Sequence, residues 1–231
     1  MCIRDSTLSV TSNQTPLFCL HGLFLYRDLA NSLNHNIKIY GVYLEEESEA
    51  QLNKNHQDVL NIETLALRYM ELILCVRPQG PYRLVGFSRG GIIALKVAEL
   101  LRSAGHEVDF VALLDTNSPM STLRGLVATL KGIGRALIGR GNKKFGTRDV
   151  TNAHYRQAYR VFSKKPHEGN VLLFRAEKSD FGQRRDDLGW SRFVKGNLAV
   201  QQVPGDHLSM LAHPNTDTLA KAMSNYVAVV E

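Results

Sequence analysis

At residues 82–94 the chain reads YRLVGFSRGGIIA, an apolar strand that runs through Gly-x-Ser-x-Gly into residues with helical spacing. This order of strand, tight turn and helix is typical of a nucleophile elbow, which raises one serine hydroxyl above a sheet. Gly86 and Gly90 fit the turn, because the serine backbone is strained there and a neighbouring side chain would collide. The segment predicts Ser88 as a nucleophile; the alternative is a glycine-rich turn whose serine only caps the helix.

The composition fits one α/β domain with a full core. The chain has 231 residues, of which 44% are hydrophobic and 22% charged, as is ordinary for a globular protein. No apolar stretch approaches the roughly 18 to 20 residues of a membrane span, and no secretory signal is visible. Cys2, Cys19 and Cys75 are odd in number and show no metal-ligand spacing. We therefore expect reduced thiols, a cytoplasmic protein and no metal site.

The net charge of +6 is concentrated in one segment. Between residues 121 and 165, eleven Lys and Arg residues accompany a single acid, Asp149, so this segment carries +10 and the rest of the chain −4. It is either a solvated basic face or an electrostatic landing site for an acidic partner. A role in nucleic-acid binding is disfavoured, because interleaved aromatic residues and a recognisable reading helix are missing.

Strands and helices alternate along the chain. We interpret residues 1–15 as a linker or non-native lead-in and residues 16–231 as one domain. Residues 117–165 interrupt the alternation and predict an inserted helical cap over one end of a mostly parallel sheet with helices on both faces. Besides the elbow, the patterns predict strands near 16–20, 37–43, 108–114, 171–174 and 199–203, and helices near 26–33, 61–76, 90–103 and 215–229.

Two further polar side chains directly follow predicted strands. Asp115 ends the apolar run 108–114, and His207 follows the last strand in a Pro-Gly-Asp-His turn. Because the carboxyl ends of parallel strands meet at one edge of a sheet, we expect both side chains near Ser88. The chain order Ser, Asp, His is that of the hydrolase arrangement. The sequence predicts Ser88 as nucleophile, His207 as its base and Asp115 as the carboxylate that orients the base.

Asp180 is the competing acid, because it follows the predicted strand at 171–174. Asp115 is favoured, since a carboxylate at the end of a buried strand is costly without a partner such as an imidazolium. Asp206 is a poor orienter, because it is adjacent to His207 in the chain. His213 is interpreted as a capping residue and His21 as part of the oxyanion loop; surface positions are expected for His35, His56, His106, His154 and His167.

Two backbone amides are expected to stabilise the oxyanion of an acyl-transfer reaction. One belongs to Arg89, directly after the nucleophile, and the other to Leu23, in the loop after the strand at 16–20.

With these residues placed, the chain resembles the thioesterase domains that end modular nonribosomal peptide and polyketide synthases, which have the α/β-hydrolase fold. The resemblance implies a lid at about 117–165 and supports Asp115 over Asp180. It covers residues 16–229 and rests on PLFCLHG at 16–22, GPYRLVGFSRGG at 80–91, LD at 114–115, VLLFRA at 171–176, LGW at 188–190 and VPGDHLSML at 203–211.

The resemblance also implies a substrate and a partner. The substrate is an acyl, peptidyl or polyketide chain on the phosphopantetheine thioester of an acidic carrier protein, expected upstream in the same synthase. The chain is released by hydrolysis or macrocyclisation, with no bound cofactor. The basic segment, including Lys143 and Lys144, then docks the carrier. One departure is that LFLY at 23–26 replaces the glycine-rich run that many members carry after the His-Gly pair.

Three other functions stay open at this point. A stand-alone editing (type II) thioesterase shares the chemistry but usually carries its acid after the later strand. A general carboxylesterase would act equally on oxygen esters. A non-catalytic module would bind acyl chains or carrier proteins without reacting at Ser88.

Overall fold

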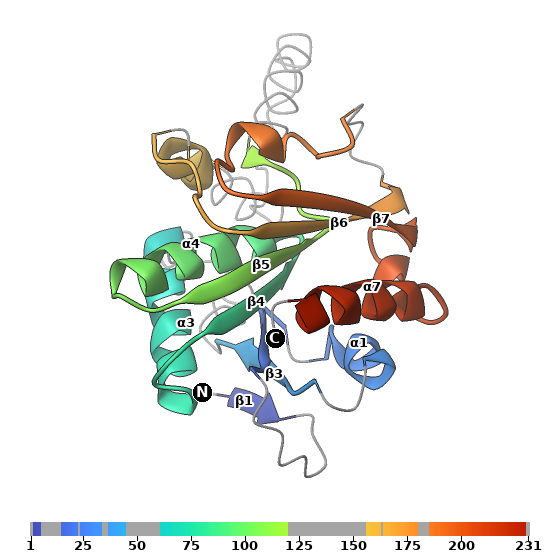
Figure 1. Ribbon diagram of the computed structural model, residues 1–231, viewed down its shortest axis with the longest axis horizontal. Coiled ribbons are helices and arrows are strands. Elements are labelled where there is room, and N and C mark those ends of the chain that lie inside the picture. Colours follow the sequence, from blue (N-terminus) through green and yellow to red (C-terminus); the bar gives the residue numbers. More distant parts are fainter. Residues whose placement is uncertain are drawn as a thin grey trace, which may run out of the picture.

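A seven-stranded sheet forms the centre of the computed structural model (Figure 1). Its order is β1-β3-β2-β4-β5-β6-β7; β1 is antiparallel to β3, and all other neighbours are parallel. The structure describes residues 2–5, 15–22, 24–33, 37–44, 61–119, 156–162, 164–179 and 185–229. The strands are β1 (Cys2–Asp5), β2 (Leu17–Leu20), β3 (Ile39–Tyr43), β4 (Tyr82–Phe87), β5 (Val108–Leu114), β6 (Val171–Lys178) and β7 (Leu198–Asp206).

Helices cover both faces of this sheet (Figure 1). One face carries α3 (Ile62–Val76) and α4 (Arg89–Ser103), and the other carries α1 (Arg27–Ser32) and α7 (Asn215–Val229). Asn61 caps α3 as expected, since its side chain accepts a hydrogen bond from the Thr64 amide at 2.8 Å. The confirmed α/β architecture follows from alternating apolar strands and amphipathic helices.

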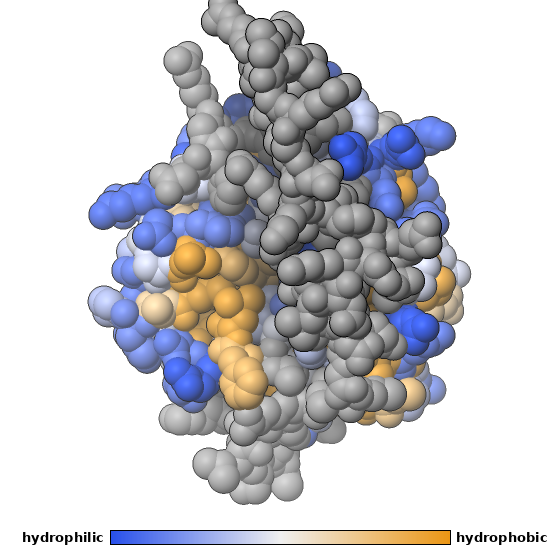
Figure 2. Space-filling view, turned by 180° about the vertical axis from the view of Figure 1, so that it is seen from behind, coloured by the Kyte–Doolittle hydropathy of each residue, from blue (hydrophilic) through white to orange (hydrophobic). Residues whose placement is uncertain are grey.

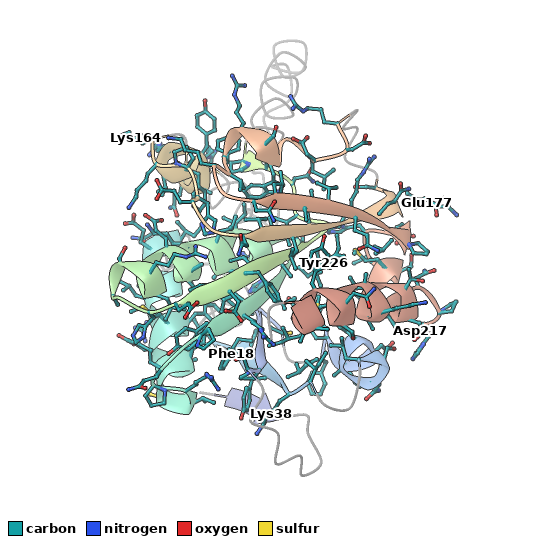
Figure 3. All side chains as sticks on the ribbon, viewed as in Figure 1. Phe18, Lys38, Lys164, Glu177, Asp217 and Tyr226 are labelled. Carbon is teal, nitrogen blue, oxygen red and sulfur yellow. The ribbon has the colours of Figure 1, made fainter. Side chains whose placement is uncertain are left out.

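Alternate residues of the central strands enter two separate apolar cores. Val111 and Leu113 of β5 pack on the α3 and α4 side, whereas Ala112 and Leu114 pack on the α1 and α7 side. This period of two makes both faces of β5 apolar, so the strand reads as a continuous apolar run. Figure 3 shows Tyr226 between α7 and the sheet, where its ring lies 6.4 Å from that of Phe174 on β6.

Three parts of the structure differ from the sequence prediction. Strand β1 was not predicted, because a four-residue edge strand with few apolar residues is ordered by pairing with β3 and not by its own pattern. Strands β6 and β7 are longer than predicted, because they pair with each other along most of their length.

The other structural predictions have limits. The boundary at residue 16 stays a prediction. Most of the predicted insertion, 117–165, lies outside the described residues. Residues 156–162 are helical, and Ala158 and Phe162 are buried in the core on the α3 and α4 side. None of the helices described here is long and apolar enough to cross a membrane.

Candidate active site

Ser88 occupies the turn between β4 and α4 in a strained backbone conformation. Its φ and ψ are 52° and −121°, and its amide donates a 2.9 Å hydrogen bond to the Leu114 carbonyl of β5. A Cβ atom at Gly86 would collide with the backbone of Gly90, and one at Gly91 would collide with the Thr116 side chain. The glycines therefore allow the close approach of strand and helix that exposes the serine.

Three side chains from distant parts of the chain form one hydrogen-bonded series. Ser88 Oγ lies 3.1 Å from His207 Nε2, and His207 Nδ1 lies 2.7 Å from Asp115 Oδ2. A carboxylate only accepts hydrogen bonds, so Nδ1 of His207 donates to it and Nε2 of the neutral ring is left to accept from the serine hydroxyl. The structure thus brings together the three residues that the sequence placed after β4, β5 and β7.

Asp115 is fully buried and is held by donors from β6 and from the residue that follows it. Its Oδ1 accepts a 3.1 Å hydrogen bond from the Ala176 amide, and its Oδ2 accepts a 3.3 Å hydrogen bond from the Ser179 hydroxyl. Together with His207, these donors satisfy a carboxylate that has no exposure to water. The competing acid Asp180 lies outside the described residues.

Neighbouring groups fix the orientation of the His207 ring. The ring stacks on Phe87, the residue before the nucleophile, with centroids 4.6 Å apart and planes inclined by 29°. The side chain of Asp206 turns the other way and accepts hydrogen bonds from the amides of Ser209 and Leu208, at 2.8 and 3.0 Å. Hydrogen bonds from Ser209 and then Leu208 hold the pKa of the Asp206 carboxyl below its usual range. Asp206 therefore braces the turn that carries His207.

The segment after β2 is tied to the elbow from two sides. The buried Tyr26 hydroxyl donates to the Leu20 carbonyl at 2.8 Å and accepts from the Phe87 amide at 2.9 Å. The guanidinium of Arg89 lies 2.7 Å from Nε2 of His21, measured from Nη2. Arg89 begins α4, where its amide is predicted to serve as one oxyanion donor. Leu23, the other predicted donor, lies outside the described residues, as do Lys143 and Lys144.

The prediction that His167 lies on the surface is wrong. His167 is only 5% exposed, and its Nε2 lies 2.9 Å from Nη1 of Arg102. Burial, and then the charge of Arg102, lower the pKa of His167 to about 3. The His167 amide donates to the Phe193 carbonyl, and its carbonyl accepts from the Lys195 amide. These contacts place His167 inside the protein, although its neighbours in the sequence are polar.

The remaining histidines have simpler places. His106 is half-buried beside the Tyr82 ring. His213 lies 3.3 Å from the Asp217 carboxylate at the start of α7. His35, His56 and His154 lie outside the described residues. Within the described ranges, no three His, Cys, Asp or Glu side chains come together to hold a metal ion.

Comparison with known proteins identifies the family. A family model described as "Thioesterase domain" matches residues 15–226. The chain belongs to the thioesterase domain family. Malpibaldin synthetase of Mortierella alpina is 28% identical over 221 residues, which make up 88% of this chain but 4% of that protein.

Two solved structures share the fold of this thioesterase domain. The NocB thioesterase domain from the nocardicin cluster gives a TM-score of 0.64 at 21% identity, covering 94% of this chain and 95% of that one. The type II thioesterase BorB from the borrelidin biosynthetic cluster gives 0.64 at 19% identity, covering 98% and 96%. The predicted α/β-hydrolase fold and the resemblance to synthase thioesterases are confirmed.

Proposed function

We propose that this thioesterase domain works through a serine nucleophile and releases an acyl, peptidyl or polyketide chain from a carrier-bound phosphopantetheine thioester. The observation that carries the proposal is the hydrogen-bonded series from Ser88 through His207 to the buried Asp115. This arrangement of alcohol, imidazole and carboxylate is the one that activates serine for attack on a carbonyl.

The first half of the reaction forms an acyl-enzyme. Nε2 of His207 takes the proton from Ser88 Oγ as the oxygen attacks the thioester carbonyl, and Asp115 stabilises the imidazolium that results. The amides of Arg89 and Leu23, the two donors predicted from the sequence, are proposed to stabilise the oxyanion. The tetrahedral intermediate collapses, the carbon–sulfur bond breaks, and the departing sulfur takes the proton from His207. The chain is then esterified to Ser88.

The second half regenerates the serine. His207 takes a proton from water, or from a hydroxyl or amine within the bound chain, as that oxygen or nitrogen attacks the ester. The bond to Ser88 Oγ breaks, and the serine recovers its proton from His207. Attack by water gives a free acid, and attack by an internal group gives a ring.

Two exposed apolar side chains lie close in the sequence to His21 and His207, which fits an acyl substrate. Phe24 and Leu208 are 70% and 71% exposed, and they belong to the chain segments next to His21 and His207. Figure 2 shows an apolar area exposed on the back of the molecule. A contiguous exposed apolar area of this kind commonly marks a place where a ligand or partner binds.

The test compares Ser88→Ala with wild type on a carrier-linked acyl thioester, a small free thioester and the matched oxygen ester. We expect Ser88→Ala to lose activity by at least about a thousandfold, while Ser103→Ala, at the exposed far end of α4, keeps it. Wild type should prefer the thioesters. Equal rates on the oxygen ester would instead favour a general carboxylesterase. Substantial hydrolysis by Ser88→Ala would refute the proposal, and failure of a fluorophosphonate to label Ser88 would favour a non-catalytic binding module.

The basic segment is proposed to dock the acidic carrier. Reversing the charges of Lys143 and Lys144 should raise KM for the carrier-linked substrate and leave the small free thioester unaffected, because only the carrier carries the complementary charge. Reversal of Lys195 and Lys221, which are exposed elsewhere, is the control for net charge. Equal effects of the Lys143 and Lys144 reversals on the two substrates would argue against docking.

A further inference from the structure

We infer that the side chain of Arg89 is a positioning residue, which holds the loop after β2 against the nucleophile elbow by its hydrogen bond to His21. The inference rests on the proposed function, since this loop leads to Leu23, the predicted second oxyanion donor. It concerns the guanidinium, whereas the proposed catalytic contact of Arg89 is made by its backbone amide.

The Arg89 guanidinium is almost enclosed, with only 6% of the residue exposed. Its Nη2 lies 2.7 Å from His21 Nε2, a distance typical of a charge-assisted hydrogen bond. A guanidinium only donates, so His21 Nε2 accepts and the neutral ring carries its proton on Nδ1. Loss of His21 leaves the buried Arg89 guanidinium with one hydrogen bond fewer, which is costly, and loss of Arg89 removes the hydrogen bond to the half-buried His21 ring.

His21 is a residue whose backbone needs support. It directly follows β2 and has φ of 66°, in the left-handed region that residues with a side chain seldom adopt. Such a conformation persists only where the surroundings hold it. Its amide donates to the Val42 carbonyl at 3.1 Å, and its ring is held by Arg89.

The loop and the elbow also approach closely in their backbones. A Cβ atom at Gly90 would lie 3.1 Å from the Leu20 carbonyl oxygen and 3.2 Å from His21 Cβ. The Tyr26 hydroxyl bridges the Leu20 carbonyl to the Phe87 amide. The residues on either side of Ser88 are therefore both tied to the end of β2, Phe87 through Tyr26 and Arg89 directly to His21.

Helix α4 also provides a matched control at its other end. Arg102 pairs with His167 at 2.9 Å, so the same two residue types make the same contact there. Residues 89 and 102 are about 20 Å apart along the helix. A defect caused only by the loss of a partly buried Arg–His pair would follow from either pair, whereas a positioning defect would follow only from the pair at the elbow.

The test measures kcat, KM and the urea midpoint of unfolding for Arg89→Met, His21→Asn and the double variant. Methionine keeps the chain length and the amide of residue 89, and asparagine tolerates left-handed backbone. We expect Arg89→Met to lower kcat by about tenfold to a hundredfold and KM to change by less than about twofold. The double variant should be no slower than the slower single variant, because both substitutions remove the same contact.

Two further measurements separate positioning from stability. The rate at which a fluorophosphonate labels Ser88 should fall in parallel with kcat, since its tetrahedral phosphorus needs the same donors. Arg89→Lys should recover part of kcat, because lysine still donates a hydrogen bond. Arg102→Met should lower the urea midpoint yet keep kcat where it is folded.

The inference is overturned if folded Arg89→Met keeps wild-type kcat, if Arg102→Met lowers kcat equally, or if the effects of Arg89→Met and His21→Asn multiply independently. Should Arg89→Met not fold, wild-type kcat in folded His21→Asn overturns it. An inactive Ser88→Ala together with an active Arg89→Met refutes only this inference, whereas an active Ser88→Ala refutes the proposed function.

Discussion

The end of the sheet where the parallel strands finish (the carboxyl edge) and the end where they begin (the amino edge) differ in how their turns are built. At the carboxyl edge, the neighbouring strands β2, β4 and β5 are followed directly by His21, Ser88 and Asp115, with φ of 66°, 52° and 42°. At the opposite edge, the turn after α4 places Gly105 in the left-handed region, with φ of 85°. The amino edge thus uses the residue that adopts this conformation at no steric cost. The carboxyl edge also has a left-handed glycine, Gly205 at the end of β7 with φ of 95°. The three turns after β2, β4 and β5 nevertheless keep functional residues in strained conformations, as active sites commonly do.

The two Arg–His pairs of α4 show the same difference. Arg89 and His21 lie beside a serine, a partly exposed imidazole and a buried carboxylate, whereas Arg102 and His167 lie near the start of β5, where Arg102 Nη2 also donates to the Val108 carbonyl at 3.1 Å. One helix therefore contributes positioning at its first turn and stability at its last. Substitutions at the two edges should separate activity from stability.

The largest effect is expected at the carboxyl edge from Asp115→Asn. The amide cannot accept the Nδ1 proton of His207 as the carboxylate does, and so favours the wrong tautomer of the ring. We expect kcat to fall by about 10⁴-fold, with Asp180→Asn as the matched control that keeps kcat. Loss of activity in Asp180→Asn with Asp115→Asn unaffected would instead favour the stand-alone editing thioesterase.

At the amino edge, His167 should make stability depend on pH. Burial and Arg102 lower its pKa from 6.5 to about 3 in the folded chain. Between these values the unfolded chain binds the proton more readily, so the free energy of unfolding decreases as pH falls from about 6.5 toward about 3. This contribution is fully present above pH 6.5 and changes by at most ~1.4 kcal/mol per pH unit.

His167→Gln removes this titration but keeps an acceptor for Arg102. Urea unfolding at pH 7 and pH 5 should therefore show a smaller loss of stability in His167→Gln than in wild type, with equal kcat at pH 7. The same pH dependence in both proteins would contradict a buried, neutral His167.

The smallest effect is expected from Ser179→Ala. The Ser179 hydroxyl is one of three donors to Asp115, at 3.3 Å, and the Ala176 amide and His207 remain. We expect kcat to fall about threefold to tenfold, while Ser191→Ala, which removes a surface hydrogen bond to Arg185, leaves it unchanged. A loss as large as that in Asp115→Asn would mean that Ser179 supplies more than hydrogen-bond support to Asp115.

The sequence predicted those features that depend on the local pattern and on sheet topology. Strand β5 was predictable because it is buried on both faces, and the meeting of Ser88, Asp115 and His207 follows from parallel strands that end at one edge. Three features could not be predicted: the burial of His167, the contact of Arg89 with His21, and the donor at Ser179. Each depends on where a polar side chain points in the folded chain, and neither periodicity nor spacing encodes that.

The most direct test of a serine-centred reaction is to look for the covalent intermediate. Wild-type protein should be mixed with excess acyl thioester, quenched in acid within milliseconds, and analysed by intact mass and peptide mapping. We predict a mass increase equal to the acyl group, located on the peptide that contains Ser88 and absent in Ser88→Ala. Turnover without any acylated Ser88 peptide, or an equal adduct in Ser88→Ala, would contradict the account.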